Sequence, residues 1–165
     1  MWGIDYLKRL RSTRGFGVHS PLAFRMVTQV LRQDYAYYAS GRLAELDTRG
    51  LPEHFADILF RLVCEFSPAA VWISPDLPRR DAVAEAVRLA DSRTRFTDHP
   101  AEAQMIVATD TLPLVPDHGV AVMASSCSPG AFEGIERGCF TFSNGTWLVG
   151  VSRPDLPRQH FEVLF

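Results

Sequence analysis

The stretch that decides the fold is FADILFRLVCEFSPAAVWIS, residues 55–74, in which an amphipathic segment runs into a short apolar one. Apolar residues recur at helical spacing up to Phe66 and form one continuous stripe, which predicts a helix from about Pro52 to Phe66. After Pro68 the period changes, and the apolar run at 69–74 is typical of a strand that is buried on both faces. A helix that leads directly into such a strand predicts an α/β sheet.

Strands and helices continue to alternate after this stretch, and turn residues separate them. The predicted elements are a helix at 79–92, a strand at 94–97, strands at 103–110 and 119–126, a helix at 129–137, a hairpin at 139–152 around Asn144-Gly145, and a strand at 158–165. This order predicts a mostly parallel sheet with helices on both faces. The tight turn of the hairpin adds an antiparallel C-terminal edge.

The N-terminal segment, residues 1–50, is predicted to be helical. Ser20 is placed to cap the first turn of a helix, and Pro21 suits the first helical position because its missing N–H is not needed there. Phe24, Val27, Val30 and Leu31 then repeat at helical spacing. With residues 51–165 as an α/β core, the chain is predicted to form one domain over residues 1–165.

Composition excludes several broad classes of protein. The chain has 165 residues and a formal net charge of −2, so nothing draws it toward nucleic acid or an anionic membrane surface. No apolar run reaches the length of about 18 residues that a membrane span needs, and the first residues lack the pattern of a signal peptide. The three cysteines have no CxxC spacing. We therefore expect a cytoplasmic protein with reduced thiols.

Several segments resemble those of bacterial class I S-adenosylmethionine-dependent methyltransferase-like proteins. RGFGVHSPLAFRMVTQVL (14–31) is similar to their N-terminal helical segment, and residues 55–74 are similar to the helix that leads into their first strand. AQMIVATD (103–110) resembles their fourth strand and GVAVMASS (119–126) their fifth. The ending TWLVGVSRPDLPRQHFEVLF (146–165) is similar to their last strands. The resemblance implies a Rossmann-like, class I methyltransferase-like sheet.

The turn after the first strand departs from the pattern of these methyltransferases. Their first strand runs into a glycine-rich turn, because only glycine lets backbone amides come close to the cofactor. The corresponding stretch here, ISPDLPRRD (73–81), contains no glycine, and Pro75 and Pro78 remove two amide donors. We therefore expect no cofactor.

The sheet is also expected to be reduced in size by an internal deletion. Residues 75–102 leave room for one helix and one short strand, whereas two crossover units of about a dozen residues each, with their strands, do not fit. Either the first helix and second strand of the family are missing, or the third strand is missing. Both alternatives remove part of the cofactor pocket.

The resemblance implies that Ser74, Asp76 and Asp110 stand at cofactor-binding positions. Asp110 has a simpler alternative role as a loop or helix cap at the end of a strand. A structural role just before the capped helix accounts for His19 first, and ligand contact is the alternative. S-adenosylmethionine is the implied cofactor if any pocket survives.

No catalytic residue and no metal site are predicted. Related O-methyltransferases often carry adjacent aspartates after the fifth strand, where this chain has Ser125-Ser126. Asp110 alone cannot supply the several oxygen ligands that a divalent cation needs. Cys127 lies at a predicted strand-to-helix turn, where nucleophiles occur, but no histidine stands at a diagnostic spacing from it.

Three functions remain open from the sequence. The first is a degenerate, non-catalytic methyltransferase-like protein that serves as a binding or assembly module. The second is an active S-adenosylmethionine-dependent methyltransferase that acts on a small molecule, and the third is chemistry at Cys127. Because a deletion uncovers a sheet edge or face, we expect a homodimer, with Tyr35, Tyr37 and Tyr38 among the candidates for cover.

Overall fold

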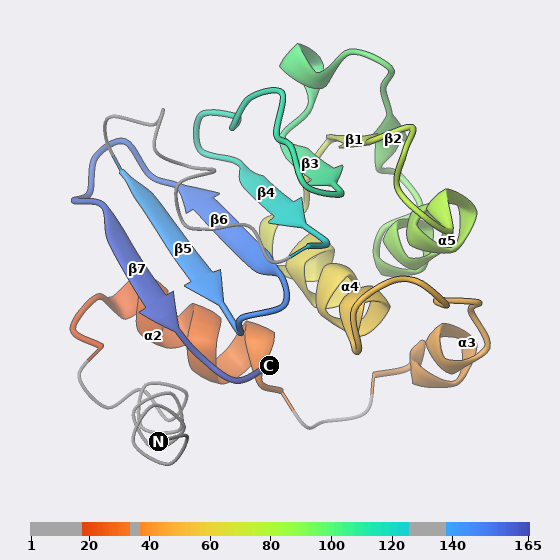
Figure 1. Ribbon diagram of the computed structural model, residues 1–165, viewed down its shortest axis with the longest axis horizontal. Helices are drawn as coiled ribbons and strands as arrows, with labels where there is room; N and C mark the ends of the chain where they lie inside the picture. Colours follow the sequence, from red (N-terminus) through yellow and green to blue (C-terminus); the bar gives the residue numbers. More distant parts are fainter. Residues whose placement is uncertain (1–17, 34–36, 126–137) are drawn as a thin grey trace.

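One seven-stranded sheet organises the part of the chain that the computed structural model describes, residues 18–33, 37–125 and 138–165 (Figure 1). The strand order is β2-β1-β3-β4-β6-β5-β7. The strands are β1 (Ala70–Ile73), β2 (Arg95–Phe96), β3 (Met105–Ala108), β4 (Val120–Met123), β5 (Cys139–Ser143), β6 (Leu148–Ser152) and β7 (Gln159–Glu162). Each lies within a segment that the apolar pattern predicts as a strand.

The sheet is mostly parallel, as the sequence predicts. Strands β2, β1, β3 and β4 pair in parallel, and β6 is antiparallel to both of its neighbours, β4 and β5. The β5–β6 hairpin turns at Asn144 and Gly145, where Gly145 has φ +88° and the Asn144 Oδ1 accepts from the Trp147 amide at 3.1 Å. The antiparallel C-terminal pairs are therefore confirmed. Strand β6 runs opposite to β5 and brings the chain back to the end of the sheet at which β5 begins. The last strand, β7, therefore runs in the same direction as β5 and pairs with it in parallel.

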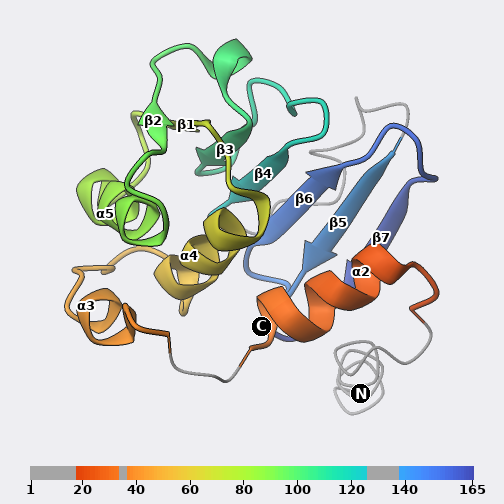
Figure 2. The same ribbon diagram turned by 180° about the vertical axis from the view of Figure 1, so that it is seen from behind.

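One face of the sheet carries the main core. The side chains on this face lie in rows that cross neighbouring strands. One such row, in which every side chain is at most 1% exposed, consists of Val71, Met105, Val120, Val151 and Phe140. The helices α2 (Pro21–Arg25), η1 (Met26–Leu31), α4 (Phe55–Phe66) and α5 (Arg80–Ala90) contribute buried side chains to the same cluster. Figure 2 shows α2, η1 and α4 in front of the strands on this face. The helix predicted at 129–137, which would cover the other face, lies outside the described residues.

The N-terminal helix confirms the predicted cap but differs in its packing face. The Ser20 hydroxyl accepts from the Ala23 amide at 3.4 Å, and Pro21 occupies the first helical position. From Met26 onward the backbone forms a π-helix, which widens the turn and changes the angular spacing of its side chains. Val27, Val30 and Leu31 are buried as their spacing predicts, whereas Phe24 is 44% exposed, so its predicted place on the apolar stripe is wrong.

Helix α4 begins at Phe55, later than the predicted Pro52, because His54 has φ +60° and cannot continue a right-handed helix. The short helix α3 (Ser40–Ala44) lies beside it. Tyr37 and Tyr38 contact Phe60 of α4 edge-on, with ring centroids 5.2 and 5.9 Å away. Tyr37 therefore packs on a helix of its own chain, Tyr38 touches the same helix but is 82% exposed, and Tyr35 lies outside the described residues.

A single helix and a single short strand follow β1 before β3, as the spacing predicts. Helix α5 packs against α4, and β2 pairs directly with β1. A one-turn 3₁₀ helix, η2 (Pro100–Glu102), precedes β3. The outer edge at β2 is short and charged, since the Arg88 guanidinium lies 4.9 Å from the Phe96 ring centre and Arg95 pairs with Glu102. Short, charged edges resist pairing with other chains.

Candidate functional site

The carboxyl ends of β1 and β3 form the candidate site, because the chain order reverses between them. From β1 the chain crosses to β2 on one side, and then returns to β3 on the other side. In open α/β sheets, ligands bind at the carboxyl ends of strands at such a switch point. Since β1 and β3 are adjacent and parallel, the predicted residues Ser74, Asp76 and Asp110 come to the same edge of the sheet.

The turn after β1 is closed by its own hydrogen bonds. The Ser74 amide donates to the Val107 carbonyl at 2.8 Å, and the Leu77 amide donates to the Ser74 carbonyl at 3.2 Å. The Ser74 hydroxyl donates to the Asp76 carboxylate. Leu77 points into the core and is 4% exposed, whereas Pro75 is exposed. The turn is thus anchored to β3 through its backbone and to the core through one side chain.

These bonds leave few amides for a cofactor in residues 74–78. The amides of Ser74 and Leu77 already have carbonyl partners, and Pro75 and Pro78 have no N–H. The Asp76 amide is the one that remains within this turn. A backbone cradle needs several free amides and close approach, which glycine permits. The residues present do not fit the glycine-rich turn of a nucleotide-type cofactor site.

The end of β3 contributes two polar residues to the same edge. Asp110 is exposed and accepts from the Thr111 hydroxyl at 3.3 Å. The preceding Thr109 has a buried hydroxyl oxygen with no hydrogen-bond partner in the described part of the chain. The sequence did not single out Thr109, because a threonine within an apolar run is an ordinary strand residue. Its unsatisfied hydroxyl is visible only once the strand is placed in the sheet.

The other candidate residues are not brought to this edge. His19 is exposed and directly precedes α2, which lies over the β5–β7 end of the sheet (Figure 1). Within the described residues no hydrogen bond or ion pair joins His19 to Ser74, Asp76 or Asp110. Ser126 and Cys127 lie outside the described residues, while Ser125 lies just after β4. Over the described ranges, no group of three or more His, Cys, Asp or Glu could hold a metal ion.

The two cysteines that the structure describes are not activated as nucleophiles. Burial raises the pKa of the Cys139 thiol to about 11. Desolvation also raises the pKa of the Cys64 thiol above its ordinary value. A reactive cysteine needs the opposite shift, because the thiolate is the nucleophile.

Comparisons with known protein families, with curated proteins and with solved structures find no match to this chain. None of the described helices is long and apolar enough to cross a membrane. The likeness to methyltransferases therefore rests on the sequence motifs alone, and the edge between β1 and β3 has to be interpreted from its own chemistry.

Proposed function

We propose that this chain is a reduced, non-catalytic methyltransferase-like protein that serves as a binding or assembly module. The observation that carries the proposal is the turn at residues 74–78. Apart from the Asp76 amide, its amides are bonded within the fold or replaced by proline, and Leu77 is buried beneath it. A turn of this kind keeps the sheet intact but offers no backbone cradle for S-adenosylmethionine.

The sheet supports the proposal at a second point. A doubly wound sheet of the dinucleotide-binding order 3-2-1-4-5-6 carries two strands beyond its first strand. Here β2 alone lies beyond β1, and it has two residues. Either deletion considered from the sequence would leave one strand at this position. A Rossmann-like, class I methyltransferase-like sheet that has lost a strand is the arrangement we propose.

An active methyltransferase with a remodelled pocket is the second candidate, and one observation favours it. The buried Thr109 hydroxyl without a partner and the exposed Asp110 carboxylate stand at the switch point, beside the Ser74–Asp76 pair. An unsatisfied buried hydroxyl is costly and is common where a ligand completes the hydrogen bonds. In this alternative, Asp76 and Asp110 would contact the polar groups of the ligand.

A second copy of the chain is the partner that we propose for an assembly role. Two-fold homodimers are the commonest closed assemblies of soluble proteins. The sequence predicts that an uncovered sheet edge or face drives dimerisation, but the β2 edge is short and charged. The dimer is therefore expected to form through another surface. That the full chain forms a homodimer remains a prediction.

A thermal-shift scan with S-adenosylhomocysteine separates the two candidate functions. A ligand at 100 times its dissociation constant stabilises a folded protein by about 2.7 kcal/mol, which raises the melting temperature by several degrees. We expect no shift for this chain. A shift that grows with the logarithm of ligand concentration, and that Asp110→Asn reduces, would favour the active enzyme.

A further inference from the structure

A cavity of about 390 Å³ lies between the end of η1, the short helix α3 and the N-terminal half of α4. Its volume falls within the range of about 300–1,000 Å³ that small-molecule sites occupy. Ser74, Asp76 and Asp110 do not line it. This cavity, named here the η1–α4 cavity, is therefore separate from the edge of β1 and β3.

Part of the lining of the η1–α4 cavity is apolar. Ile58 of α4 is fully buried, and Leu43 of α3 is 5% exposed. Phe165 also lines the cavity and is held in place, because its ring meets the Trp147 ring edge-on with centroids 5.0 Å apart. These side chains come from separate parts of the chain. Together they offer a fixed hydrophobic surface for a compact apolar group.

Arg61 lines the cavity as well, but its guanidinium is already engaged within the fold. Its Nε donates to the Asp57 carbonyl at 3.2 Å, and its Nη1 donates to the Gln33 carbonyl at 3.0 Å. These bonds join the segment after η1 to α4. Arg61 is 9% exposed and bonded in this way, so it holds the two segments together and is not an anchor for an anion.

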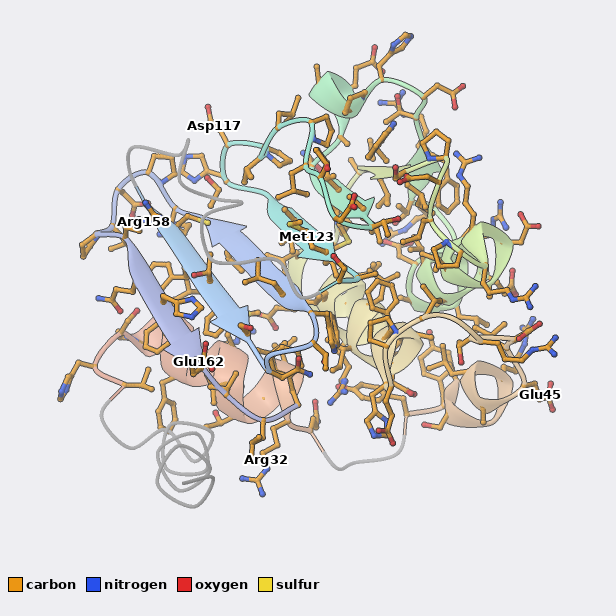
Figure 3. All side chains as sticks on the ribbon, in the orientation of Figure 1. Arg32, Glu45, Asp117, Met123, Arg158 and Glu162 are labelled. Carbon is orange, nitrogen blue, oxygen red and sulfur yellow. The ribbon has the colours of Figure 1, made fainter. Side chains whose placement is uncertain are left out.

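The other charged residues of the cavity lie at its rim. Asp57 and His54 are exposed, and Figure 3 shows the Arg32 side chain pointing outward from the end of η1. The acidic Asp57 and the basic Arg32 oppose each other in charge. A charged ligand that entered the cavity would lose hydration without gaining a buried ion pair, which is costly. The lining therefore favours a neutral ligand.

Gln33 and Tyr37 place a hydrogen-bond donor beside an acceptor in this lining. The Tyr37 hydroxyl donates to the Gln33 Oε1, and within the described residues the Gln33 Nε2 has no partner. The Tyr37 hydroxyl oxygen keeps its capacity to accept. Burial raises the pKa of Tyr37, so this group stays uncharged near neutral pH. The Tyr37 amide donates to the Ser40 hydroxyl at 2.8 Å, which fixes the backbone beside the pair.

A carboxamide complements this pair of side chains and carries no charge. Its carbonyl oxygen accepts a hydrogen bond, and its amino group donates one. The Gln33 Nε2 is a donor for the carbonyl, and the Tyr37 hydroxyl oxygen is an acceptor for the amino group. Because the two side chains are already bonded to each other, they lose little conformational entropy when a ligand binds.

We propose that the η1–α4 cavity is a binding site for a small neutral carboxamide with a compact apolar body. The carboxamide bonds to Gln33 and Tyr37, and the apolar body rests on Leu43, Ile58 and Phe165. The site shares no residue with the edge of β1 and β3. It therefore stands or falls independently of the proposed loss of cofactor binding.

The test is a titration of the full-length ¹⁵N-labelled protein with benzamide, followed by amide chemical shifts. We expect saturable shifts that cluster at Gln33, Tyr37, Ser40 and Ile58, with half-saturation below about 10 mM, as is typical of a ligand of this size. Benzoate and benzylamine keep the ring but carry a negative and a positive charge, respectively. Both should bind at least about tenfold more weakly than benzamide, because neither finds a buried ion pair.

Two matched variants then locate the carboxamide. Q33L removes the donor and should weaken benzamide binding about threefold or more. Q29L makes the same change at an exposed residue of η1 that lines only a neighbouring cavity of about 440 Å³, and it should leave the affinity unchanged. Should Q33L fail to fold, the order of the three probes on the unaltered protein decides alone. Absence of saturable shifts with benzamide, equal or tighter binding of a charged probe, or an equal loss in Q29L and Q33L would overturn the proposal.

Discussion

The hydroxyl of Ser74, the first residue after β1, donates a hydrogen bond to the carboxylate of Asp76 two residues later. The two polar side chains that the sequence places at a cofactor position thus bind each other. Beneath them Leu77 enters the core, and the Ser74 amide is bonded to β3. Most polar groups of this turn are therefore bonded within the fold, and the Asp76 amide is the exception among residues 74–78. These contacts are typical of a structural turn and not of an open ligand-binding site.

Truncation of Leu77 tests whether the turn is anchored in the core. Leu77→Ala removes a side chain that is 4% exposed, and we expect a loss of about 2–5 kcal/mol in the free energy of unfolding. Pro75→Ala is the matched control in the same turn, since Pro75 is exposed. Urea denaturation of the three proteins gives both values. A loss below about 1 kcal/mol for Leu77→Ala would show that the turn is not packed as described.

Replacement of Ser20 tests the cap of α2. Ser20→Ala should cost about 0.5–1 kcal/mol, because the Ala23 amide loses the acceptor that lies 3.4 Å away. Ser20→Asp keeps an acceptor at this position and should retain most of the stability. Chemical denaturation distinguishes the two variants. Equal stability of Ser20→Ala and the parent chain would mean that the hydroxyl does not cap the helix.

Most of the sheet could be predicted from the sequence, because buried strands such as β1, β3 and β4 consist of short apolar runs between turn residues. The missing glycine after β1 was equally visible. The burial of Leu77 could not be predicted, since the residues around it between Pro75 and Pro78 show no helical or strand-like apolar pattern. It takes the packed core to show that this side chain points inward.

The errors have local physical causes. Phe24 is 44% exposed, whereas Val27, Val30 and Leu31 are buried, and residue spacing alone does not show which side of a short helix ends at the edge of the core. Residue spacing does not reveal the π-helix that begins at Met26 either. The parallel pairing of β7 with β5 depends on which side of the hairpin the last segment reaches. The sequence does not predict a cavity lined by Gln33, Arg61 and Phe165, because these residues are far apart along the chain.

The raised pKa of Cys139 predicts a loss of stability in alkaline solution. Its folded-state pKa of about 11 lies above the ordinary value of 9.0, so the unfolded chain loses the thiol proton first as the pH rises. The unfolding free energy should therefore fall between about pH 9 and pH 11. In Cys139→Ala the unfolding free energy should change less between these pH values, even if the variant is less stable at every pH. The same slope in both proteins would contradict a buried thiol.

Alkylation gives an independent check on the same residue. With iodoacetamide at pH 8, the peptide that contains the buried Cys139 should stay unmodified in the native protein and react in urea, whereas the exposed Cys64 should react in both conditions. Peptide mass spectrometry reads out the two sites separately.

Light scattering tests the proposed dimer. At micromolar concentration we expect a mass of twice 18.5 kDa for the full chain. Tyr38→Ala is a useful second sample, because Tyr38 is a large exposed side chain near α3. A mass of 18.5 kDa that does not rise with protein concentration would show that the chain is a monomer.

We expect that the turn after β1 does not bind a methyltransferase cofactor. Isothermal titration calorimetry with S-adenosylmethionine and with S-adenosylhomocysteine, at ligand concentrations up to about 5 mM, measures this directly. We predict only the heat of dilution for both ligands, since residues 74–78 retain a single free amide and no glycine. A saturable isotherm with either ligand, weakened by Asp76→Asn or Asp110→Asn, would contradict the account and establish a working cofactor site.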